Sequence, residues 1–201
     1  MSDIPINLAV EDDLSEAVLR EILKQSQRPF SIGNCLKRRG YGYLKKNLRG
    51  INNAAKGSPY LVLTDLDRNE CPLAVLSDWL PYPKHPNLIF RVAVVEVEAW
   101  LLAHRKAFAD FLGISIDLIP HDIDSETDPK RLLIDLAKRS RKRNLRDAIV
   151  PPQGSTAKIG RDYNGQLIEF VNQNWQVAAA RDCSRSLDRA MNAIIHFEPT
   201  W

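Results

Sequence analysis

Acidic residues stand directly behind each of three short apolar stretches in this sequence. The stretches cover residues 6–10, 60–64 and 88–95. The acids that follow them are Glu11, Asp12 and Asp13, then Asp65 and Asp67, then Glu96 and Glu98. If the stretches are strands of one parallel sheet, their carboxyl ends lie along one edge, where such sheets bind ligands. The sequence therefore predicts a cluster of carboxylates at that edge.

Carboxylates held this close repel one another, so the cluster costs stability unless a cation or raised pKa values relieve the repulsion. Oxygen ligands in this number suit Mg²⁺ or Mn²⁺, which keep several waters and bind a few carboxylates together with substrate phosphates. We therefore expect a divalent metal whose ligands come from Glu11, Asp65, Asp67, Glu96 and Glu98.

A simpler role competes with metal binding for some of these acids. Acidic residues after strands are common as helix caps and first-turn residues, and Glu11, Asp12 and Glu98 each fit that role. The Asp-x-Asp pair at Asp65 and Asp67 is harder to explain in this way, because two acids there serve no joint capping purpose. All three strand ends together favour a metal site.

The elements that must position these acids alternate between strand and helix. Helical spacing of apolar residues predicts helices around 14–23, 43–51 and 72–80, and one longer helix from 96–98 to Gly113. A glycine-rich, basic stretch at 32–42 is assigned neither strand nor helix, and the proline-rich residues 81–86 predict a loop. The alternation is typical of an α/β fold with a central parallel sheet flanked by helices.

Beyond Gly113 the pattern becomes helical and basic, with helices expected near 128–140, 162–174 and 185–196. The sequence thus predicts a sheet domain over residues 1–115 and a helical, basic C-terminal extension over 116–201 that packs on it. His104, six residues after Glu98, is expected to be a partly buried helix residue.

The composition is that of an ordinary globular chain. It has 201 residues, of which 44% are hydrophobic and 26% charged, with a net charge of +3. No apolar run is long enough to span a bilayer, and the first residues lack the order of a signal peptide. Three widely spaced cysteines argue against a disulfide framework and a structural zinc site, so we expect a cytoplasmic protein that does not contact the membrane.

Positive charge concentrates after the sheet domain. Residues 128–161 hold ten Lys and Arg side chains against three acids. A surface of this kind attracts nucleic acid, which the acidic cluster alone would repel, although basic runs are often only solvated helix faces. The candidate nucleic-acid contacts are Lys138, Arg139, Arg141, Lys142, Arg143 and Lys158.

Three segments resemble the TOPRIM domain, which is shared by topoisomerases, primases, OLD-family nucleases and RloB-like proteins. They are VEDDLSE at 10–16, LTDLD at 63–67 and RVAVVEVEAWLLA at 91–103, and the last resembles a Glu-x-Glu-Ala-Trp-x-Leu-Ala signature. The segments 160–164 and 184–189 are similar to weaker C-terminal motifs of small stand-alone relatives. Two departures stand out, because Asp12 replaces a glycine and His104 stands where relatives often have an acid.

The resemblance implies roles for four catalytic residues. Asp65 and Asp67 correspond to the metal-binding pair, and Glu11 corresponds to an acid that serves as general acid/base or as metal ligand. Glu98 matches the Glu-x-Trp spacing to Trp100 and ranks above Glu96. By this resemblance the chain is expected to be a Mg²⁺- or Mn²⁺-dependent nuclease of DNA or RNA.

The resemblance also implies a setting, because such relatives often stand beside an ATPase in bacterial anti-phage systems. A toxin-like effector that is controlled by an ATPase partner is the resulting expectation. The main alternative is a non-catalytic subunit that binds nucleic acid or the ATPase through the same fold. Phosphoryl transfer on a small nucleotide and assembly into a homo-oligomer are left open.

Overall fold

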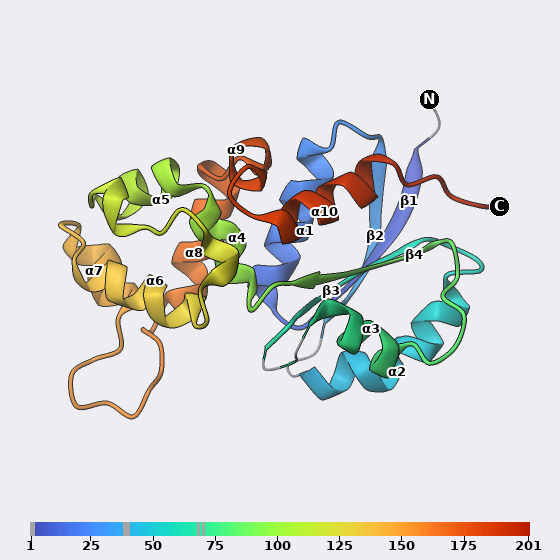
Figure 1. Cartoon of the computed structure of the whole chain (residues 1–201), viewed down its shortest axis with the longest axis horizontal. Coiled ribbons are helices and arrows are strands. Elements are labelled where there is room, and N and C mark those ends of the chain that lie inside the picture. Colours follow the sequence, from blue (N-terminus) through green and yellow to red (C-terminus); the bar gives the residue numbers. More distant parts are fainter. Residues whose placement is uncertain (1–2, 38–40, 68, 70) are drawn as a thin grey trace.

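The centre of the protein is a four-stranded parallel sheet with the strand order β2-β1-β3-β4. The computed structural model describes residues 3–37, 41–67, 69 and 71–201. Strands β1 (Ile4–Val10), β3 (Tyr60–Asp65) and β4 (Leu88–Ala93) correspond to the three predicted strands, and every pairing is parallel. Helices lie on both sides of the sheet (Figure 1), so the predicted α/β fold with a central parallel sheet is confirmed.

The sequence did not reveal the fourth strand. Strand β2 (Phe30–Lys37) lies at the edge of the sheet and pairs with β1, where the glycine-rich stretch was assigned no strand. Most of its side chains are exposed or only partly buried, so it lacks the continuous apolar run of a central strand. The pairing is irregular between Ile6 and Leu8, and there Asn7 Oδ1 accepts a hydrogen bond from the Asn34 N–H at 2.9 Å.

Each face of the sheet is covered by its own set of helices. On one face, α2 (Tyr41–Ala54) and α3 (Pro72–Trp79) pack against Ala9, Val62 and Phe90. On the other, α1 (Asp13–Gln25) and the later helices pack against Leu8, Val10 and their neighbours. Successive side chains of β1 therefore enter opposite cores, as the alternation of a strand requires.

The C-terminal half is helical, as expected, but more finely divided. Its helices are α4 (Val97–Ala103), α5 (Arg105–Leu112), α6 (Pro129–Lys138), α7 (Arg143–Ile149), α8 (Tyr163–Gln173), α9 (Val177–Arg181) and α10 (Arg185–Ile195), with short 3₁₀ turns at Ile116–Leu118 and Ile123–Ser125. Helices α6, α8 and α10 confirm the three helices expected beyond Gly113. The short helices α7 and α9 were not predicted.

The prediction of one continuous helix up to Gly113 was wrong. The helix is interrupted at His104, because its backbone angles (φ −81°, ψ 62°) are not helical. Helices α4 and α5 are therefore separate. The His104 ring does not sit within a helix, and its Nδ1 accepts a hydrogen bond from the Gln176 N–H at 3.1 Å. The His104 backbone keeps local hydrogen bonds to Leu101 and Phe108, while its ring contacts a residue far along the chain.

Residues from both halves of the chain form the larger hydrophobic core. Trp100 is fully buried there, its indole N–H donates to Ser186 Oγ at 2.6 Å, and its carbonyl accepts from the Trp175 indole at 3.0 Å. Helix α10 packs against β4, and α8 packs against α1. Within the described ranges, no helix has the length and apolar character needed to cross a membrane.

Gly160→Ala is expected to destabilise the protein by about 2 kcal/mol, because its new methyl group would overlap backbone atoms. A Cβ there would lie 2.1 Å from the Ala148 carbonyl oxygen and 2.5 Å from the Ile149 carbonyl carbon. Gly50→Ala is the matched control, since a Cβ in this interior turn of α2 meets nothing within 4 Å. It should stabilise the protein by about 0.5–1 kcal/mol through helix propensity. Urea unfolding of both variants measures the contrast, and equal effects would contradict the close approach at Gly160.

Candidate active site at the carboxyl edge of the sheet

The ends of β1, β3 and β4 bring acidic residues to one edge of the sheet. Glu11 follows β1, Asp65 is the last residue of β3, and Glu96 and Glu98 stand at the start of α4. The strands are neighbours in the order β1-β3-β4, so the three ends lie next to one another. Glu11, Asp65, Glu96 and Glu98 therefore lie along the same edge of the sheet. Their hydrogen bonds and ion pairs show how they are arranged there.

The turns that follow β3 and β4 are held in unusual backbone geometry. Asp67 and Val95 both have positive φ, at 49° and 58°. The Asp67 N–H donates to the Val95 carbonyl at 3.0 Å, and the Leu66 N–H donates to the Ala93 carbonyl at 2.9 Å. A β-branched residue such as Val95 adopts positive φ only at an energetic cost, and such strain concentrates at functional sites.

Glu11 is a partly buried carboxylate at the opening of the cluster. One of its oxygens accepts a hydrogen bond from the Thr64 hydroxyl at 2.6 Å. Burial raises the pKa of Glu11, the charges of Asp67 and Asp12 raise it further, and the Thr64 hydrogen bond acts against them. Glu11 therefore holds its proton more tightly than an exposed glutamate does.

Asp65 lies deeper in the cluster. Its Oδ1 accepts the Val97 N–H at 2.9 Å, which satisfies a free backbone donor in the first turn of α4. Burial raises the pKa of Asp65 well above its usual range, and the negative charges of Glu98 and Glu11 raise it further. Asp65 is therefore close enough to both Glu98 and Glu11 for their charges to influence its ionisation.

Glu98 is almost fully buried and meets two partners from the C-terminal half. The Tyr163 hydroxyl donates to Glu98 Oε1 at 3.1 Å, and the Lys130 ammonium lies 3.4 Å from the same oxygen. Lys130 also contacts Glu96 Oε1 at 3.2 Å, and its backbone N–H donates to Glu96 Oε2 at 3.2 Å. Burial raises the pKa of Glu98, while the charge of Lys130 opposes that rise.

Lys130 is the cation inside this acidic cluster. Burial by itself would lower its pKa, but the charges of Glu98 and Glu96 outweigh burial and hold the pKa above the ordinary lysine range. Lys130 therefore stays an ammonium group, and its charge also lowers the pKa of Asp65. Part of the mutual repulsion of the carboxylates is relieved in this way.

The remaining acids have different roles. Asp12 is the N-cap of α1 and accepts the Ser15 N–H at 2.8 Å, which confirms the capping interpretation for this residue. Asp13 forms an ion pair with Lys37. Asp67 is exposed and contributes its charge to Glu11. The inner cluster thus consists of Glu11, Asp65 and Glu98, with Glu96 joined to it through Lys130.

The donor atoms of this cluster suit Mg²⁺ or Mn²⁺ in their chemistry, because all are carboxylate oxygens. In the part of the chain that the structure describes, no three His, Cys, Asp or Glu side chains form a ready-made metal cage. Mg²⁺ usually takes one or two carboxylates and completes its shell with water and phosphate oxygens. Glu11 and Asp65, whose repulsion Lys130 relieves only in part, meet that requirement.

Sequence reasoning missed three polar residues of the cluster, namely Thr64, Lys130 and Tyr163. Thr64 looked like an ordinary strand residue, and Lys130 was counted with the basic segment. Tyr163 lies in the segment 160–164, whose resemblance to a family motif was the one available signal. Glu98 is 32 positions from Lys130 and 65 positions from Tyr163. These residues meet only because α6 and α8 pack beside the cluster.

The candidate nucleic-acid contacts are surface residues at and beyond the end of helix α6. Helix α6 begins beside the cluster at Lys130, and Lys138 ends it about 12 Å further along its axis. Lys138 pairs with Asp135, Arg143 pairs with Asp147, and the Lys142 ammonium donates to the Asp110 carbonyl. Arg139, Arg141 and Lys158 are exposed to solvent. Nucleic-acid binding by these six residues stays a prediction.

Asp65→Asn is expected to stabilise the fold at alkaline pH. The raised pKa means that the folded chain binds more protons than the unfolded chain, from the ordinary aspartate range up to the raised value. The free energy of unfolding therefore falls as pH rises through that window. Asparagine keeps an oxygen for the Val97 N–H but carries no charge. Urea unfolding in metal-free buffer should show a larger gain at pH 8 than at pH 4, and equal gains would contradict the charge repulsion.

Comparisons with protein-family models, curated proteins and solved structures found no match to this chain.

Proposed function

We propose that this protein is a Mg²⁺- or Mn²⁺-dependent nuclease whose active site is the carboxylate cluster at the sheet edge. The observation that carries the proposal is the meeting of Glu11, Asp65 and Glu98 from three strand ends. Burial raises the pKa of all three, and neighbouring carboxylates raise each pKa further, which is typical of functional sites. The resemblance of three segments to the TOPRIM domain supports the same proposal.

Each residue of the cluster has a role in this proposal. Glu11 and Asp65 would hold the metal, with Asp67 at the exposed side. When bound, the ion would lower the pKa of a coordinated water and neutralise charge on the phosphate. The resemblance also allows Glu11, which is partly exposed, the alternative role of general acid/base, in which it would take the proton of the attacking water while Asp65 holds the metal. Tyr163 orients Glu98 through its hydroxyl, and Thr64 orients Glu11.

The positive charge of Lys130 in the cluster favours a substrate that carries phosphate. Its ammonium is shared between Glu96 and Glu98 and remains 38% exposed, so one side of it is open to solvent. An ammonium beside a metal site can bind a phosphate oxygen as a point charge. The basic segment 128–161 adds the long-range attraction that a polyanionic substrate requires.

The wider setting follows from the resemblance and is part of the proposal. The chain would be the nucleic-acid-cleaving effector of an anti-phage system, controlled by an ATPase partner. The acidic cluster and the basic segment concern only cleavage and substrate binding, so the ATPase is tested separately, by co-purification.

A non-catalytic binding subunit is the second candidate, and one observation favours it. Asp12, Asp65 and Glu96 all accept backbone N–H groups in the first turns of helices, so these acids already have structural partners. In that case the ion pairs of Lys130 complete a structural network, and the basic segment docks nucleic acid or a partner.

Incubation with nucleic acids separates the two candidates. The purified chain is mixed with single-stranded DNA, double-stranded DNA and tRNA, each with Mg²⁺, Mn²⁺ or a chelator, beside an Asp65→Ala/Asp67→Ala variant. The nuclease proposal expects metal-dependent cleavage that the variant loses, and the cleaved substrate identifies DNA or RNA. Intact substrates whose migration is retarded equally by both proteins would contradict the nuclease and support the binding subunit. Where the protein alone is inactive, the assay is repeated with the co-purified ATPase.

A further inference from the structure

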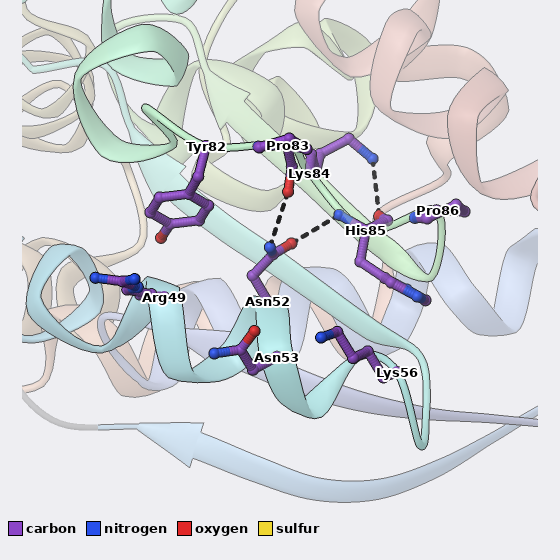
Figure 2. Close-up of a pocket in the computed structure, with 9 residues that line it drawn as sticks. All are labelled: Arg49, Asn52, Asn53, Lys56, Tyr82, Pro83, Lys84, His85 and Pro86. Atoms are coloured by element: carbon purple, nitrogen blue, oxygen red, sulfur yellow. Dashed lines mark hydrogen bonds between the residues drawn. The ribbon is translucent and has the colours of Figure 1, made fainter.

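A second polar site lies on the side of the sheet where the strands begin, opposite the carboxylate cluster. It is a pocket of about 450 Å³ between the C-terminal half of α2 and the loop that leads into β4 (Figure 2). The pocket lies where β3 and β4 begin, whereas the carboxylate cluster lies where they end. The two sites therefore have separate residues and separate chemistry.

Among the residues that the structure describes, the pocket is lined by arginine, lysine, histidine and neutral side chains and by no carboxylate. Arg49 and Lys56 approach it from α2 and its C-terminal end, and Lys84 and His85 come from the loop. Across the described residues, neither Arg49, Lys56 nor His85 forms an ion pair with an acid. This differs from the basic segment, where Lys138 and Arg143 are paired with neighbouring aspartates. The positive charges of Arg49 and Lys56 at the pocket are therefore not neutralised by an acid among the described residues.

A buried asparagine fixes the shape of the loop. Asn52 donates through Nδ2 to the Pro83 carbonyl at 3.1 Å, and its Oδ1 accepts the His85 N–H at 2.8 Å (Figure 2). His85 Nδ1 accepts the Asn87 N–H at 3.2 Å, so the proton of the neutral ring is on Nε2. That nitrogen is therefore a hydrogen-bond donor. The loop holds its donors in place before any ligand arrives, which lowers the entropic cost of binding.

Two further contacts shape the pocket. The Arg49 guanidinium stands 5.9 Å from the centre of the Tyr82 ring, which orients this long side chain. Lys84 donates to the Leu88 carbonyl at 2.7 Å. Burial lowers the pKa of Lys84, and the like charge of Arg91 lowers it further.

We propose that this pocket binds a phosphate group carried by a nucleotide or by a nucleic-acid backbone. At one end of the pocket Arg49 offers a planar pair of donors that matches phosphate oxygens, and at the other end Lys56 and His85 offer single donors (Figure 2). The Asn53 amide, which also lines the pocket, is a neutral donor. The inference is independent of the proposed nuclease activity, because it requires neither the metal nor the carboxylate cluster.

Isothermal titration with inorganic pyrophosphate, in a buffer that contains a chelator, tests the pocket directly. The Arg49→Gln/Lys56→Gln variant should bind pyrophosphate about tenfold more weakly than the parent chain, because two charged donors are lost. Lys46→Gln is the matched control, since Lys46 is exposed on the same helix but does not line the pocket. Thermal unfolding of all variants establishes that they fold equally well.

Two further ligands distinguish the sources of the phosphate. Adenosine diphosphate that binds as tightly as a ten-nucleotide single strand supports a free nucleotide. A strand that binds more tightly, with a steep dependence on salt, supports a nucleic-acid backbone. The proposal is overturned if the parent chain binds none of these ligands, or if Lys46→Gln weakens binding as much as the double variant. Cleavage activity at the other edge affects neither outcome.

Discussion

Asp65→Asn is expected to reduce metal-dependent cleavage about a thousandfold, which corresponds to about 4 kcal/mol of transition-state stabilisation. Asp65 belongs to the inner cluster and lies within the electrostatic influence of Glu98, Glu11 and Lys130. Asparagine preserves the size of the side chain and the oxygen that accepts the Val97 N–H at 2.9 Å. The variant therefore removes one charge from the proposed metal site and leaves the start of α4 in place.

The same substitution is expected to raise stability at alkaline pH, so lost activity is separable from misfolding. Asp110→Asn is the matched control, because Asp110 is exposed on α5 and pairs only with Lys106 among the acid–base pairs described. Initial cleavage rates of the three proteins at saturating Mg²⁺ give the comparison. A variant at Asp65 that keeps more than about a tenth of the parent rate would contradict a metal-binding role for this carboxylate.

Lys130→Met is expected to destabilise the protein by about 2 kcal/mol at pH 8, because it leaves Glu98 buried without its counter-ion. Breaking a fully buried pair costs about 3–5 kcal/mol, and the smaller figure follows from the 38% exposure of the Lys130 side chain. The pKa of Glu98 is already raised by burial, and loss of Lys130 raises it further. The glutamate then takes up a proton as pH falls, so the destabilisation should shrink between pH 8 and pH 5.

A double variant isolates the pair itself. In Glu98→Gln/Lys130→Met the buried negative charge is also gone, and a neutral amide still accepts from the Tyr163 hydroxyl. Urea unfolding of both single variants and the double variant gives the coupling energy between the two residues. Additive effects, or a loss in Lys130→Met that is equal at pH 5 and pH 8, would show that Lys130 does not neutralise Glu98.

The sheet was predictable wherever its strands are buried on both faces. β1, β3 and β4 are central or well covered, and their continuous apolar runs identify them. β2 lies at the edge with alternating exposed residues, and its pairing with β1 depends on contacts such as Asn34 with Asn7. At the break between α4 and α5, the His104 ring accepts a hydrogen bond from Gln176, which is 72 positions away. Such long-range contacts leave no local pattern in the sequence.

The acidic part of the site was predictable for a topological reason. Neighbouring parallel strands end at the same edge of the sheet. Acids that directly follow β1, β3 and β4 are therefore brought to the same edge. The separate role of each acid was not predictable. Asp12 serves as an N-cap and Asp67 faces solvent, whereas Asp65 is buried in the cluster. Lys130 and Tyr163 reach the cluster only through the packing of the C-terminal helices onto the sheet.

The position of bound Mn²⁺, located by anomalous scattering in crystals grown with the ion, tests whether Glu11 and Asp65 share a divalent cation. One ion per chain is expected at the carboxyl edge of the sheet, with oxygens of Asp65 and Glu11 in its coordination shell. Crystals of Asp65→Asn grown in the same way should lack that ion. A parent structure that binds no Mn²⁺ at this edge, and keeps Lys130 alone as the cation of the cluster, would contradict a metal-dependent active site.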